Sequence, residues 1–164
     1  MKKTLACLLA ALAGCASPPP PEPASESSSP PAPAVPSATA APAAVTASAA
    51  RSLDSYKVDL ANRISQSNAA KVYEGRPQAL LRSVIVVRYT IDRNGNLTHS
   101  EILRSNRDRI TESIALASLR SAAPFPRPGS HLLKNGRVEV SESWLFNSDG
   151  RFQLRSIAQA QMTE

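Results

Sequence analysis

The segment Val84-Ile85-Val86-Val87-Arg88-Tyr89-Thr90-Ile91-Asp92-Arg93-Asn94-Gly95-Asn96-Leu97 decides the fold. Its first eight residues are mostly β-branched or aromatic, which favours a well-buried strand. The strand residues that share one face are Ile85, Val87, Tyr89 and Ile91. Asn-Gly supplies the positive φ angles of a tight hairpin turn. We therefore predict a β-hairpin whose second strand, 97–104, is less covered because polar residues interrupt its apolar ones.

Helical periodicity flanks this hairpin on both sides. Apolar residues at intervals of three and four predict a helix over 52–70. A stripe of alanine and leucine predicts a second helix over about 109–122, capped by Asp108 or Ser105. Pro124-Phe125-Pro126 must end that helix, because proline lacks the amide and restricts the residue before it.

Two further strands follow the second helix. Alternating apolar residues predict a long strand over 137–146, in which only Glu142 interrupts the apolar face. A turn then leads to a short strand at 152–154. Helices on one face of a small sheet satisfy this order most simply. We predict an α+β fold: a two-layer sandwich with a mainly antiparallel sheet of three to four strands packed with two helices.

The chain begins with a segment that looks like a bacterial lipoprotein signal. Lys2 and Lys3 precede an apolar run that closes in Leu12-Ala13-Gly14-Cys15. The run is too short to span a bilayer, which takes about 20 residues. The resemblance implies that residues 1–14 are removed and that Cys15 is lipidated. Ala16 at the sorting position implies the periplasmic face of the outer membrane. The alternative is an ordinary secretory signal, which would leave a soluble periplasmic protein.

Residues 15–50 have the composition of a spacer. Ten of the 14 prolines fall before residue 51, and the segment from 17 to 50 is Pro, Ala and Ser with two glutamates and no aromatic residue. Such a composition cannot build a core, so we predict a disordered linker. A ligand for aromatic grooves is the alternative reading. The folded domain is then 51–164.

The composition argues against several classes of function. The net charge of +6 is carried by scattered arginines and lysines without interleaved aromatics, which disfavours nucleic acid but leaves anionic lipid or an acidic protein segment. His99 and His131 fall in a predicted strand and loop, and Cys7 leaves with the leader. No serine lies in a Gly-x-Ser-x-Gly elbow. We expect no catalytic residue, no cofactor and no metal site; a hydrolase is the alternative that stays open.

Three stretches together resemble the C-terminal domain of the TonB/TolA family. They are 84–97, then Ile102-Leu103-Arg104-Ser105, then the Ala/Leu helix from Ile114 that runs straight into Pro-Phe-Pro, which is the most specific. The resemblance covers roughly 50–155. Ser83 and Ser105-Asn106-Arg107 depart from the pattern, since the family often has glycine and Ser-Ser-Gly there. Transducers of the family also keep an N-terminal membrane helix, so this chain is not expected to couple directly to a motor.

The resemblance implies binding of an extended peptide that adds a strand to the edge of the sheet. We place this edge on 138–146. The predicted short strand at 152–154 could already cover that edge, in which case it would have to move for a partner. The edge residues that we predict are Val138, Val140, Glu142, Trp144 and Phe146. The predicted partner is an envelope protein such as a TonB-dependent outer-membrane transporter, and dimerisation stays open. The alternative function is a structural envelope lipoprotein that rests on peptidoglycan or lipid head groups.

Overall fold

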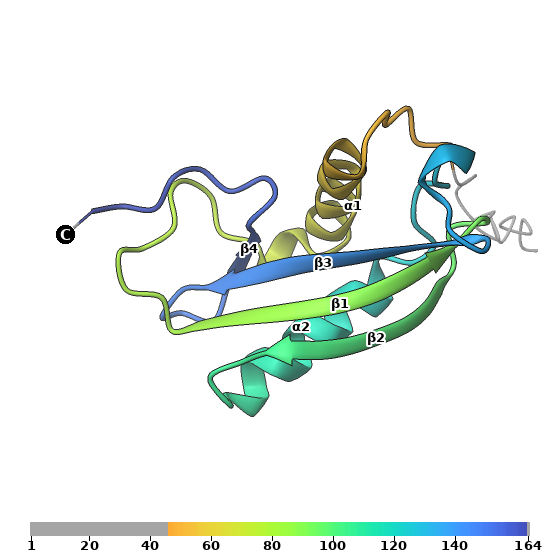
Figure 1. The fold of residues 1–164 in the computed structure, drawn as a ribbon. Coiled ribbons are helices and arrows are strands. Elements are labelled where there is room, and N and C mark those ends of the chain that lie inside the picture. The colour runs from red at the N-terminus through yellow and green to blue at the C-terminus, as the bar shows by residue number, and fades with distance from the viewer. Residues whose placement is uncertain (1–45, 164) are drawn as a thin grey trace, which may run out of the picture. The chain divides into compact units, whose positions relative to one another are not determined.

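Four antiparallel strands form an open sheet, and two helices pack on one of its faces (Figure 1). The computed structural model describes residues 46–163, so the predicted leader, the lipidation of Cys15 and nearly all of the spacer lie outside the described residues. The elements in chain order are α1 (Leu53–Ser67), η1 (Ala69–Lys71), β1 (Ser83–Asp92), β2 (Leu97–Arg104), α2 (Arg109–Ser121), η2 (Ser130–Leu132), β3 (Arg137–Phe146) and β4 (Phe152–Leu154). The sheet order is β2-β1-β3-β4, which confirms the predicted α+β architecture.

Local side-chain hydrogen bonds start both helices. Ser52 and Ser55 form a reciprocal capping box at the beginning of α1. The carboxylate of Asp108 accepts the amides of Ile110 and Thr111 at the beginning of α2, so Asp108 is the cap of the two candidates. These bonds satisfy amides that have no partner inside the helix.

The predicted hairpin joins β1 to β2. The carboxylate of Asp92 accepts the amides of Asn94 and Asn96, and Gly95 takes a φ of +88°. The β1–β2 ladder has register irregularities at two places, between Val86 and Val87 and between Thr90 and Ile91. The β1–β3 ladder instead runs through ten consecutive pairs without a break, which makes these two strands the regular centre of the sheet.

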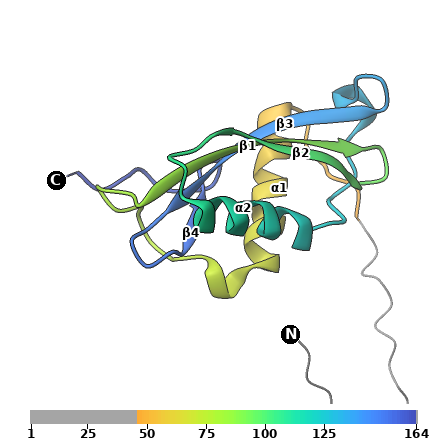
Figure 2. The same cartoon turned by 90° about the horizontal axis from the view of Figure 1, so that it is seen from below.

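The core lies between the sheet and the two helices, which Figure 2 shows on the same side of the strands. The predicted inner face of β1 is buried, and Trp144 of β3 is completely so. Phe125, which follows α2, is also fully buried and stacks on Tyr89 with ring centroids 6.2 Å apart. Its ring therefore fills space under the sheet. The opposite face of the sheet carries no helix among the elements described.

Candidate functional site

The long strand β3 is paired along its whole length on one side only. β1 covers one edge, whereas β4 pairs with Trp144–Phe146 alone. Beyond β4, the amide of Arg155 donates to the carbonyl of Ser143 at 3.0 Å. At the other end, Arg137 exchanges both backbone hydrogen bonds with Lys134 in a tight turn. Between these two closures lies an unpaired segment, Val138–Glu142, which we call the open β3 edge.

The hydrogen-bond pattern shows which residues point their backbone out of this edge. In an antiparallel ladder the two backbone groups of one residue face one neighbour and those of the next residue face the other. Asn147 and Ser143 bond to the β4 side, so the odd-numbered residues of β3 face that side. Glu139 and Ser141 therefore direct their N–H and C=O groups outward. Within residues 46–163, no hydrogen bond from a loop or side chain reaches these groups.

The five residues predicted from the sequence lie on the same strand but on its inner face. Their side chains are buried, at 3% exposure or less for Val138, Val140, Glu142, Trp144 and Phe146. Being even-numbered, they direct their backbone groups toward β1 rather than outward. Glu139 and Ser141, which sequence reasoning did not select, are exposed and supply the free groups. Alternation in the sequence divides the strand into two sets of residues. The order of the strands decides which set directs its backbone N–H and C=O groups toward the open edge.

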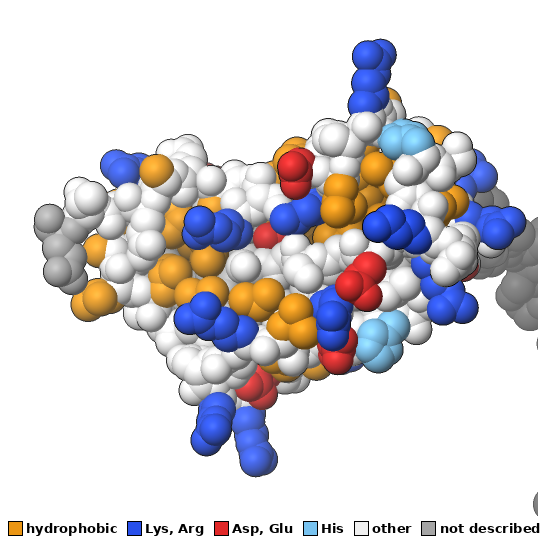
Figure 3. Space-filling model, in the orientation of Figure 1, with side chains coloured by type: hydrophobic (Ala, Val, Ile, Leu, Met, Phe, Trp, Pro, Cys, Tyr) orange, Lys and Arg blue, Asp and Glu red, His pale blue; other side chains and the backbone are white. Residues whose placement is uncertain are grey.

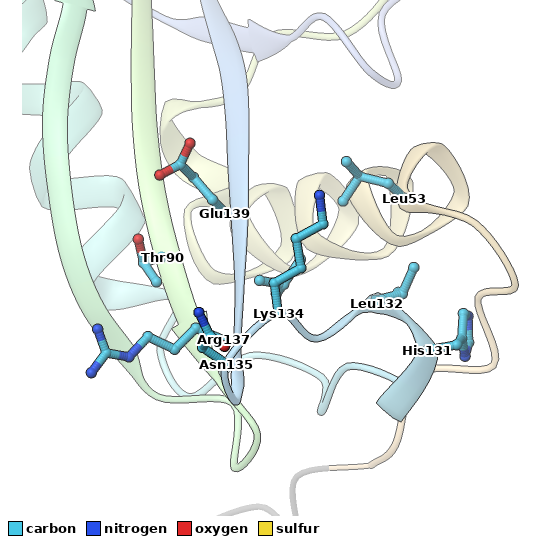
Figure 4. A pocket seen from close by; sticks show the side chains of 9 residues that line it. Leu53, Thr90, His131, Leu132, Lys134, Asn135, Arg137 and Glu139 are labelled. Carbon is cyan, nitrogen blue, oxygen red and sulfur yellow. The ribbon is translucent and has the colours of Figure 1, made fainter.

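A cavity of about 670 Å³ adjoins one end of the open β3 edge. Figure 4 shows it between β3, the start of α1 and the η2 turn, with Leu53 and Leu132 on the far side from the strand. Leu53 is 42% exposed although it is apolar. The side chain of Lys134 points between β3 and α1 (Figure 4). The cavity therefore offers apolar walls and the cations Lys134 and Arg137 beside free backbone groups.

Glu142 is the one charged residue among the buried side chains of β3. It is 3% exposed, and its Oε1 accepts the amide of Ser143 at 2.7 Å. Its Oε2 is buried and has no hydrogen-bond partner. Burial raises the pKa of Tyr89 well above its usual value, and the charge of Glu142 raises it further. Glu142 lies opposite Val87 of β1, at the end of the open β3 edge.

The helix-free face of the sheet is mixed in character, with apolar patches between charged groups (Figure 3). Arg88 pairs with Glu101 at 2.6 Å on this face. A second hollow, of about 630 Å³, lies over the start of β1, and Arg104 and Arg155 are among the residues that line it. These two arginines are among the basic residues that are scattered along the sequence.

The histidines do not form a site. The side chain of His99 is 62% exposed on β2, and His131 lies at the cavity rim in η2. In the described part of the chain, no group of three His, Cys, Asp or Glu residues could hold a metal ion.

No helix among residues 46–163 has the length and apolar character needed to cross a membrane.

Comparison of the chain with protein-family models, with curated proteins and with solved structures finds no match. The resemblance to the TonB/TolA family accordingly rests on the quoted residues and stays a prediction. A fold of this class serves many functions, so the function must be argued from the site itself.

Proposed function

We propose that this protein is a binding module of the cell envelope that docks an extended segment of a partner along the open β3 edge by strand addition. The observation that carries the proposal is the unpaired backbone of Glu139 and Ser141 beside the cavity. Main-chain hydrogen bonds supply affinity in this mode of recognition, and side-chain pockets supply specificity. A lipid anchor at Cys15 would hold the domain at the outer membrane, and a TonB-dependent transporter is the partner class that we propose.

The open β3 edge suits a partner strand better than the outer edge of β2. The β1–β2 ladder has two register irregularities, and such bulges twist an edge away from further pairing. The β1–β3 ladder is regular, so the open β3 edge is straight enough to template a strand. The cavity also adjoins β3 and can receive a side chain of the partner.

The geometry limits the docked segment to a short peptide. The open β3 edge spans five residues, Val138–Glu142, or about 16 Å at roughly 3.3 Å per residue. Its free N–H and C=O groups can form four backbone hydrogen bonds. β4 lies farther along the same side of β3, so it blocks continuation of the docked strand in that direction.

A matched pair of proline variants tests this proposal. The described residues fall within one compact unit, Ala40–Glu164, so this unit can be purified and used to select binders from random heptapeptides displayed on phage. Ser141→Pro removes an outward amide of the open β3 edge. Ser100→Pro is the control: its neighbours His99 and Glu101 face β1, so the Ser100 amide points out of the other edge. Proline at an edge position facing solvent is tolerated in a sheet.

The dissociation constant of a selected peptide should rise at least about tenfold in Ser141→Pro and stay unchanged in Ser100→Pro, since one hydrogen bond and close approach of the strand are lost. Circular dichroism checks that both variants are folded. Equal effects of the two variants, or no effect of Ser141→Pro, would refute strand addition at β3. Affinity should also change little with salt, whereas binding through scattered arginines and lysines weakens steeply.

A further inference from the structure

The carboxylate of Glu142 is buried without a cation to balance it. No ion pair of Glu142 occurs among residues 46–163, and its one hydrogen bond comes from the amide of the next residue. Burial of a charged group without a full set of partners is costly, because the group gives up its hydration. The folding of the domain alone does not explain this group, since Val140 and Trp144 on the same face are apolar and equally buried.

The hydrogen bond to Ser143 shows where this carboxylate lies. Ser143 is odd-numbered, so its amide points out of the same side of β3 as those of Glu139 and Ser141. Its carbonyl already accepts the amide of Arg155 at 3.0 Å. The Glu142 side chain must therefore bend from the inner face around the strand edge. Its Oε1 occupies the position that a carbonyl of an added strand would take.

An added strand ends beside this carboxylate, because Arg155 already pairs with Ser143 and limits the strand to the open β3 edge. Such a strand leaves Oε2 buried and unpaired at its end. A donor on the partner is therefore needed, and a cation forms the strongest hydrogen bonds to a carboxylate.

We propose that the docked segment carries an arginine or lysine that binds the carboxylate of Glu142. This inference rests on the proposed strand addition and specifies its partner. Residues opposite Val138 and Glu142 lie on the same face and four positions apart, because side chains alternate along a strand. The cavity at the Val138 end has the apolar walls Leu53 and Leu132. The recognised segment is therefore a peptide with one apolar and one basic residue separated by three others.

Nonapeptide libraries with a fixed central residue test this inference, because a residue four positions from the centre then lies at either end of the peptide. Five libraries carry Arg, Lys, Gln, Ala or Glu at the centre and random residues elsewhere, and each is selected against residues 40–164. Peptides from the Arg and Lys libraries should bind about 10- to 100-fold more tightly than those from the Ala library, as expected for a hydrogen bond between charged groups. The Glu142→Gln variant keeps the shape and an acceptor for Ser143, and it should abolish this preference. The control Glu74→Gln changes an exposed carboxylate that lies outside the open β3 edge and the cavity, and it should preserve the preference.

The outcomes separate this inference from the proposed function. Binders that Ser141→Pro abolishes, but that show no preference for a basic residue, overturn the inference and leave strand addition standing. A preference that persists in Glu142→Gln also overturns it, because another acceptor then binds the cation. If no library yields a binder that depends on Ser141, strand addition itself fails. Thermal unfolding of both glutamine variants verifies that each is folded.

Discussion

Replacement of Glu142 by leucine should stabilise the free domain. The substitution removes a buried oxygen that has no partner, which relieves about 1–3 kcal/mol. Leucine at a position that is 3% exposed adds apolar burial of roughly 1.5–3 kcal/mol. The lost hydrogen bond to Ser143 costs about 1 kcal/mol. Allowing for imperfect packing of the new side chain, we expect the free energy of unfolding to rise by about 2 kcal/mol.

Urea unfolding monitored by tryptophan fluorescence measures this change directly, because Trp144 is the one tryptophan of the chain and is fully buried. A rise of about 2 kcal/mol corresponds to a shift in Tm of roughly 8 °C for a domain of this size. The matched control is Glu139→Leu on the exposed face, which should change stability by no more than about 0.5 kcal/mol. If Glu142→Leu instead lowers stability, the carboxylate is well satisfied in the free protein. The carboxylate would then need no cation from a partner.

The remaining predictions concern the core. Ser118→Ala removes the acceptor of the buried Trp144 indole N–H, which lies 2.9 Å away, and should lower the free energy of unfolding by about 1–3 kcal/mol in urea titration. Phe125→Ala should lower it by about 3–5 kcal/mol in the same assay, because the ring is fully buried; a loss below about 1 kcal/mol would contradict the packing described. Burial, then the charge of Asp149, raises the pKa of Tyr73 to about 12 from 10.0. This pKa is higher in the folded state, so its stabilising effect is complete below pH 10.0 and is lost as pH rises toward about 12. Burial raises the pKa of the other two tyrosines as well. Absorbance at 295 nm should therefore show no tyrosine ionising near pH 10 before the protein unfolds, and a folded-state transition there would contradict the burial.

Most of the sheet and both helices could be predicted because their signals are local. Alternation and helical periodicity set the positions of β1, β3 and α2, and the Asn94-Gly95 turn set the hairpin. The segment between α1 and β1 was not predicted in this way. The amide of Tyr73 donates to the carbonyl of Phe152, and Arg76 donates to carbonyls of the C-terminal tail. The acceptors of these long-range contacts are backbone carbonyls, which impose no repeating pattern on the side chains.

The candidate site was predictable only in part, for a related reason. The sequence indicated the strand and a short strand that could cover its edge, whereas β4 covers only Trp144–Phe146. The identity of the outward backbone groups depends on which strands flank β3. Glu139 and Ser141 could be selected only after the order β2-β1-β3-β4 was known. Side-chain alternation alone is compatible with either order of neighbours.

Glu142 shows what a broken pattern can indicate. In the sequence it is the single charged residue on an otherwise apolar strand face, and the structure shows no compensating cation for it within residues 46–163. A residue that contradicts its surroundings without a local gain is a candidate for function rather than folding. The unfolding experiment measures what the Glu142 carboxylate costs the free domain, and the peptide selection measures what it contributes to binding. A Glu142→Leu domain that is more stable, and has also lost its preference for basic peptides, would show that the carboxylate lowers stability in the free protein and contributes to binding.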